Sequence, residues 1–123
     1  MTIPLFTATA VQAQECKNPQ TQTEMNHCAT MELEAATGEL KKVYNEYLIR
    51  LSEEQKKQIQ EAQLVWIRFR DLTCKFESSG SQGGSAYGMV FSFCLTRMTR
   101  ERTKQLQELA SCKEGDLSCP AWK

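Results

Sequence analysis

Six cysteines are the residues most able to do chemistry in this chain of 123 residues, and their number is even. Zinc sites and thiol redox enzymes favour Cys-x-x-Cys units or clusters of cysteine and histidine, and the sequence contains neither. An even number of cysteines in so short a chain instead predicts structural disulfides and an oxidising compartment. The six are Cys16, Cys28, Cys74, Cys94, Cys112 and Cys119.

Acid–base catalysis has few candidate residues. His27 is the only histidine, and a single histidine early in a helix is more often a surface residue than a base. The carboxylate pairs Glu32–Glu34 and Glu53–Glu54 are typical of solvated helix faces and of first helical turns. A glycine-rich segment at residues 78–84 lacks the Gly-Lys-Ser/Thr ending of a phosphate-binding loop. The sequence therefore predicts a protein that is not an enzyme and that uses no metal or cofactor.

One polar group has helical spacing. Trp66, Arg70 and Cys74 follow each other at steps of four, so they share a helix face, and Asp71 is next to Arg70. Arg102 interrupts an apolar stripe further along the chain and is expected to point to the same region. Two interpretations follow: a partly buried ion-pair network that fixes helix register, which we favour, or a polar recognition patch.

Composition limits the class of protein. Fifteen Lys and Arg balance fifteen Asp and Glu, apolar residues make up 41%, and mean hydropathy is -0.49. A chain of zero net charge has no global basic field, which argues against nucleic-acid binding. No apolar run approaches the roughly 20 residues that span a bilayer. The sequence does not define an oligomeric state.

The first residues predict export. Residues 1–13 read MTIPLFTATAVQA, and Val11 and Ala13 occupy the small-residue positions of a signal-peptidase site. A basic residue at the front is missing, which a misplaced start codon would explain; a disordered cytosolic N-terminus is the alternative. We therefore expect a signal peptide at residues 1–13 and one domain at residues 14–123, in the periplasm or secreted.

Two capping boxes predict the starts of the first two helices. Thr21 and Glu24 have the spacing in which a hydroxyl and a carboxylate each accept from the other residue's backbone N–H, and Ser52 and Gln55 repeat it. The break between the helices is short, so they should pack as an antiparallel hairpin. The first helix carries one apolar stripe, formed by Met25, Ala29, Leu33, Ala36, Leu40, Val43, Tyr47 and Leu51.

The second helix is apolar over much of its circumference, which predicts a central position with neighbours on two sides. After it, residues 78–84 read SSGSQGG and must form a loop, and Ser85 is the expected N-cap of a third helix. The fold class is therefore all-α, a three-helix antiparallel bundle tied by disulfides. The apolar residues of the second helix are Ile59, Ala62, Leu64, Val65, Trp66, Ile67, Phe69, Leu72 and Phe76, and those of the third are Tyr87, Phe91, Cys94, Leu95, Met98, Leu106 and Leu109.

Helix rise suggests how the cysteines pair. At about 1.5 Å per residue, the cysteines of the first and third helices lie at similar heights, and those of the arm and the second helix lie near the same end. We therefore expect Cys28–Cys94 and Cys16–Cys74, with Cys28–Cys74 and Cys16–Cys94 as the rival pairing. The two cysteines of the tail should close a small ring, Cys112–Cys119.

Four segments resemble the LprI-type lysozyme inhibitor family, a group of small exported bacterial helical domains. They are QTEMNHCA at residues 22–29, AQLVWIRFRDLTCKFE at 62–77, GGS at 83–85 and CLTRMTRERTKQL at 94–106. The family pattern Ala-Asp-x-x-Leu-Asn-x-x-Tyr is matched by Ala36, Leu40 and Tyr44, whereas Thr37 and Lys41 replace its two polar residues.

The resemblance implies an exported binding protein whose partner is a protein, with lysozyme as the candidate partner. A cleft that holds two catalytic carboxylates would accept a low-volume loop with hydrogen-bonding groups. Residues 79–87 have that composition, although a plain connector would have it too. The alternative function is a structural or protein-interaction module of the cell envelope. The candidate interface comprises Ser81, Gln82, Gly83, Gly84, Ser85 and Tyr87.

Overall fold

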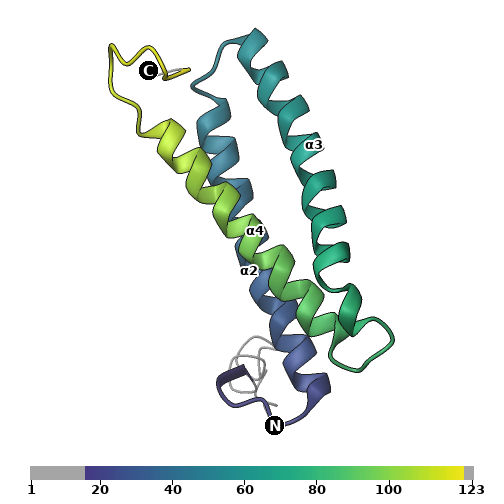
Figure 1. Cartoon of the computed structure of the whole chain (residues 1–123). Helices are drawn as coiled ribbons and strands as arrows, with labels where there is room; N and C mark the ends of the chain where they lie inside the picture. The colour runs from purple at the N-terminus through teal and green to yellow at the C-terminus, as the bar shows by residue number, and fades with distance from the viewer. Residues whose placement is uncertain (1–15, 121–123) are drawn as a thin grey trace, which may run out of the picture.

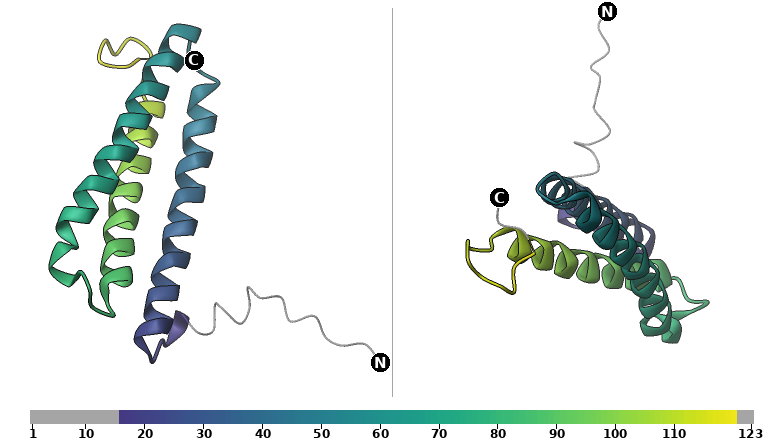
Figure 2. Two further views of the ribbon diagram at one scale, coloured as in Figure 1. Left: turned by 90° about the vertical axis from the view of Figure 1, so that its right-hand side faces the viewer. Right: turned by 90° about the horizontal axis from the view of Figure 1, so that it is seen from above.

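The computed structural model describes residues 16–120 and contains three long helices (Figure 1). They are α2 (Gln22–Leu48), α3 (Glu53–Glu77) and α4 (Tyr87–Ala110), with a 3-10 turn, η1 (Ser79–Ser81), between the last two. The helices run up, down and up along one long axis, so the start of α2 and the α3–α4 loop share one end of the bundle (Figure 2). Within the described residues there is no β-strand, and the predicted all-α three-helix bundle is confirmed.

Both predicted capping boxes are present. The Thr21 side chain accepts from the backbone N–H of Glu24 at 3.1 Å, and the Glu24 carboxylate accepts from the backbone N–H of Gln20 and of Thr21. Ser52 and Gln55 make the equivalent pair of bonds at 3.2 and 3.1 Å. Four residues separate α2 from α3, and the second capping box therefore fixes where the chain reverses.

The substitution Ser52→Ala is expected to lower the free energy of unfolding by about 1 kcal/mol, because it leaves an early backbone N–H of α3 without its acceptor. Chemical denaturation of the two proteins measures the difference. Ser79→Ala is the matched control, since Ser79 is exposed and is expected to change stability by less than about 0.5 kcal/mol. Equal effects of the two substitutions would contradict the role given to the cap.

The core lies mainly between α2 and α4, which make most of the contacts between elements. Leu106 and Tyr47 are among the most deeply buried large side chains. Buried threonines of α4 turn their hydroxyls back to their own helix: Thr99 donates to the Leu95 carbonyl at 2.6 Å and Thr103 to the Thr99 carbonyl at 3.0 Å. The other buried apolar residues of the two helices are Ala29, Ala36, Leu40, Val43, Cys94, Leu95 and Met98.

The prediction that the second helix is central is wrong. Cys74 is the only residue of α3 that is fully buried, and the helix stands apart from α2 along much of its length (Figure 1). A narrow seam of half-buried residues, Ile59, Gln63, Trp66 and Arg70, faces the other helices. An apolar circumference indicates that a helix has several contact surfaces, but it does not require the same chain to cover all of them. The exposed apolar residues of α3 are Leu64, Val65, Ile67, Phe69, Leu72 and Phe76.

The disulfides correct two predicted pairs. The bonds are Cys16–Cys28, Cys74–Cys94 and Cys112–Cys119, so Cys16–Cys74 and Cys28–Cys94 are wrong, as is the rival pairing. Heights along the bundle do not decide the pairing, because the sulfur must also point toward its partner. The arm before α2 folds back on its own helix, with 5.4 Å between the Cα atoms of its pair. The second bond joins α3 to α4 across the loop, and the predicted ring Cys112–Cys119 is confirmed.

The expected signal peptide and a short C-terminal tail are at the two ends of the sequence. The expected signal peptide at residues 1–13 lies outside the described residues. After α4, residues 111–120 form turns closed by the third disulfide, and the Gln55 amide donates to the Pro120 carbonyl at 2.8 Å. In the described part of the chain, no helix has the length and apolar character needed to cross a membrane.

Candidate functional site

The glycine-rich segment between α3 and α4 is a series of tight turns rather than an open connector. Backbone N–H groups of Ser81, Gln82 and Gly84 donate to carbonyls three residues earlier at 3.0 to 3.2 Å. Gly83 has a φ of 85°, in the left-handed region that side chains with a Cβ rarely adopt. The composition of the segment therefore follows from its turns as well as from any contact with a partner.

Three contacts fix this loop to the bundle. The buried Ser78 hydroxyl donates to the Cys74 carbonyl at 2.6 Å, which ties the start of the loop to the end of α3. The Asn26 side-chain amide of α2 donates to the Ser85 carbonyl at 3.0 Å. The Tyr87 backbone N–H, at the start of α4, donates to the Gly84 carbonyl at 3.3 Å. The loop is thus held from all three helices.

Ser85 is not the N-cap that the sequence predicts. Ala86 occupies the cap position, and its side chain makes no capping hydrogen bond. The Ser85 carbonyl is engaged by α2 while the residue itself remains exposed. Helix α4 therefore starts one residue later than predicted, and the contact of Ser85 with α2 is one that local sequence does not reveal.

The six predicted interface residues divide into a tip and its support. Gln82, Gly83, Gly84 and Ser85 are exposed at the end of the bundle, whereas Ser81 and Tyr87 are half-buried beneath them. Residues 78–87 carry no charge, so the tip offers an amide, hydroxyl groups and backbone groups for hydrogen bonding. Such a tip can enter a narrow polar cleft, because glycine and serine add little volume.

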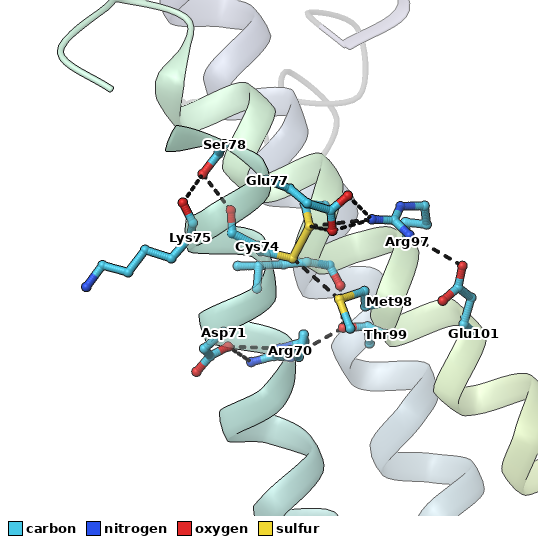
Figure 3. Close-up of a disulfide and its surroundings, with 12 residues drawn as sticks. Arg70, Asp71, Cys74, Lys75, Glu77, Ser78, Arg97, Met98, Thr99 and Glu101 are labelled. Atoms are coloured by element: carbon cyan, nitrogen blue, oxygen red, sulfur yellow. Dashed lines mark hydrogen bonds and ion pairs between the residues drawn. A yellow bond between two sulfur atoms is a disulfide. The ribbon is translucent and has the colours of Figure 1, made fainter. Parts of the chain in front are cut away.

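The disulfide Cys74–Cys94 forms the base of the loop (Figure 3). On its exposed side, the Arg97 guanidinium donates to both oxygens of Glu77 at 3.0 and 2.9 Å. On its buried side, the Met98 sulfur lies 3.7 Å from Cys74 Sγ. The Glu77–Arg97 bridge was missed by sequence reasoning, since the two residues are twenty positions apart and on different helices.

The same region contains a group of three side chains able to bind metal. Sulfur and carboxylate atoms of Cys74, Glu77 and Cys94 lie within 4.8 Å of one another. The disulfide engages both sulfurs, which removes the thiolates that a zinc or copper site would need. The arrangement is therefore a covalent joint between two helices.

The predicted polar network is present in part. Arg70 donates to the Asp71 carboxylate at 3.0 and 2.8 Å and to the Thr99 hydroxyl at 3.3 Å, and its guanidinium lies over the Trp66 ring at 5.3 Å. Of these contacts, only the bond to Thr99 crosses from α3 to α4, whereas Asp71 and Trp66 belong to α3 itself. That bond is consistent with the favoured interpretation, a network that fixes helix register.

Arg102 bonds to other residues than the predicted ones. It donates to the side-chain oxygens of Gln63 at 3.0 Å and of Gln105 at 3.2 Å. Burial lowers the pKa of Arg102, and the nearby Tyr44 opposes this shift. Burial likewise raises the pKa of Tyr44, and the Arg102 charge opposes it. Arg102 thus forms a second polar contact between α3 and α4, one that also faces α2.

The acid–base candidates of the sequence lie on open surfaces. His27 is exposed on α2, as are Glu32 and Glu34. Glu53 pairs with Lys56 at 3.1 Å in the first turn of α3. The exposure of His27, Glu32 and Glu34 is that of ordinary helix-surface residues.

The chain is similar to one protein family and to one uncharacterised bacterial protein. Residues 13–106 match the family described as lysozyme inhibitor LprI. An uncharacterised protein of Rhizobium meliloti (strain 1021) is 30% identical over 114 aligned residues, covering 82% of each chain. No solved structure matches the chain. The family match spans the three helices up to Leu106 and includes the loop. The chain therefore belongs to the LprI lysozyme inhibitor family.

Proposed function

We propose that this protein is an exported, non-catalytic inhibitor of lysozyme, and that the exposed loop tip, residues 82–85, enters the cleft of the enzyme. The observation that carries the proposal is the loop itself. It is exposed, uncharged and small in volume, and hydrogen bonds join it to Asn26 of α2 and to the backbone N–H of Tyr87 in α4.

Fixing the loop in advance favours binding. A loop that is disordered before binding loses conformational freedom when it enters a cleft, which costs roughly 0.5–1.5 kcal/mol for each side chain that becomes fixed. Here the turns, the disulfide at the base and the Asn26 contact define the conformation of the free protein. The loop is therefore already ordered in the free protein, and it loses little further conformational freedom when it binds.

Chemical complementarity is the second support. The lysozyme cleft contains a carboxylic acid and a carboxylate that act on the glycosidic bond. The Gln82 amide and the Ser85 hydroxyl are donors to such groups, and both residues are exposed at the tip. Export is supported by the three disulfides, which form and persist in oxidising compartments, and by the family name.

A lysis assay with a charge-altered tip tests the proposal. The protein in micromolar excess should slow lysozyme-driven clearing of a bacterial cell-wall suspension. Gln82→Glu should weaken this inhibition at least tenfold, because it places a carboxylate of nearly the same shape against the catalytic carboxylates. Gln60→Glu is the matched control: it makes the same change at an exposed site on α3 and should inhibit like the unaltered protein.

Two outcomes would contradict the proposal. Unchanged lysis with lysozymes of several classes would remove the activity and leave an interaction module of the cell envelope as the better interpretation. Inhibition that Gln82→Glu and Gln60→Glu weaken equally would retain the activity but exclude the loop tip as the contact surface.

A further inference from the structure

The exposed side of α3 carries an unpartnered apolar stripe, defined here as Ala62, Val65, Phe69, Leu72 and Phe76. Every member of this α3 stripe is exposed, and the relative exposure of the four larger residues is 64% for Val65, 60% for Phe69, 56% for Leu72 and 79% for Phe76. Contiguous exposed apolar side chains on a protein of this size mark an interaction site. The stripe lies on the helix that the rest of the chain covers least.

The spacing of the stripe is that of a helix pair. Its members follow each other at steps of three, four, three and four, the repeat with which two helices pack side by side along a left-handed seam. A shallow hollow beside Trp66, lined by Ala62, Val65 and Phe69 of the same helix, continues the apolar surface. The stripe therefore fits another long helix better than it fits an irregular segment.

We propose that the occupant is α3 of a second copy, packed antiparallel so that the protein forms a two-fold symmetric dimer. In the register that places Val65 opposite Phe69 of the second copy, Ala62 lies opposite Leu72, so small side chains meet large ones. Both contacts occur twice because the interface is two-fold symmetric. This pairing would cover α3 on its second side, as its apolar circumference requires.

In the same register, residues of opposite charge beside the stripe lie opposite each other in the two copies. Glu61 and Lys75 flank the same edge of the stripe, both are exposed, and the salt bridges of the described residues do not include them. In the antiparallel dimer Glu61 lies opposite Lys75 of the second copy, and the symmetry repeats the pair. Arg68 lies near the two-fold axis, where its length and exposure let its charge turn to solvent.

The seam is short, at about 21 Å along the helix. Interfaces of this length bury little area, and we expect a dissociation constant in the micromolar range, roughly 1–100 µM. This inference does not rest on the proposed inhibition of lysozyme, because the α3 stripe and the loop tip have no residue in common.

Sedimentation of the purified chain from about 1 to about 200 µM tests the dimer. The unaltered protein should change from monomer to dimer, and Val65→Glu should raise the dissociation constant at least tenfold by burying a charge. Leu64→Glu is the matched control: Leu64 is 70% exposed on the same helix but off the stripe, so its variant should dimerise normally. Far-UV circular dichroism shows whether each variant remains helical.

Charge reversal tests the register. Glu61→Lys and Lys75→Glu should each weaken the dimer about tenfold, and the double variant should restore it to within about threefold. A protein that remains a monomer at every concentration would overturn the proposal. If Val65→Glu then also weakened the inhibition of lysozyme, the stripe would be a contact surface for the enzyme rather than for a second copy. Equal weakening by Leu64→Glu, or a double variant weaker than either single one, would overturn the proposed pairing.

Discussion

Replacing Cys74 and Cys94 together by serine is expected to lower the free energy of unfolding by about 3 kcal/mol. The disulfide closes a segment of 20 residues, and in the chain-entropy description a loop of this length contributes roughly that amount. It also joins the least buried helix to α4, at the only fully buried position of α3. The effect should therefore combine a lost constraint on the unfolded chain with a weaker α3–α4 contact.

Thermal unfolding under non-reducing conditions measures this effect. For a domain of this size the expected loss corresponds to a fall in Tm on the order of 10–20 °C. Replacing Cys112 and Cys119 by serine is the control, because that bond closes a shorter loop, of 7 residues, in the tail rather than between two helices, and should lower Tm by less. A larger fall for the tail variant than for the α3–α4 variant would contradict the assignment of the main covalent joint.

Leu106→Ala is expected to lower the free energy of unfolding by about 3 kcal/mol, within the range for removing a fully buried leucine side chain. Leu106 has a relative exposure of 0% and packs with Leu40 and Val43 of α2. The helices cannot close the resulting cavity without moving α4 against α2, the contact that forms most of the core.

Leu64→Ala is the matched control for this substitution. Leu64 is exposed, so removing the same atoms should change stability by less than about 0.5 kcal/mol. Urea denaturation of both variants measures the change in the free energy of unfolding. The comparison requires that the slope of the transition, the m-value, is the same as in the unaltered protein. A loss below about 1 kcal/mol for Leu106→Ala would place the core somewhere other than between α2 and α4.

Local signals in the sequence predicted the elements well. The pairs Thr21–Glu24 and Ser52–Gln55 are complete capping boxes in the structure, because both partners lie within one turn. The glycines and serines after α3 correctly predicted a loop. These features are decided by residues three or four positions apart, which is the range over which helix periodicity and capping chemistry act.

Features that depend on distant contacts were predicted less well. The rise of a helix gives the height of a cysteine but not the direction of its sulfur. The sequence therefore predicts Cys28–Cys94, whereas the structure has Cys16–Cys28. The apolar residues of α3 indicated a covered helix, yet this chain covers only one side of it. Arg102 was expected near Arg70 and Asp71 but bonds to Gln63, because the face of α4 on which it lies meets α3 at a different level.

Composition predicts the loop, but it does not predict the contacts that hold the loop in place. Nothing in the local sequence indicates that Asn26 holds the Ser85 carbonyl, or that Glu77 and Arg97 bridge the helices above the disulfide. These contacts turn a flexible composition into a fixed surface. A loop held in this way presents the same surface before and after it meets a partner, whereas a mobile linker would not.

Hydrogen–deuterium exchange of the protein with and without excess lysozyme shows whether the loop tip is the surface that contacts the enzyme. Slower exchange concentrated at residues 79–87, with the middle of α2 unchanged, is the result expected if the loop enters the enzyme. Exchange that is the same with and without lysozyme, or that slows only along α3, would contradict the claim.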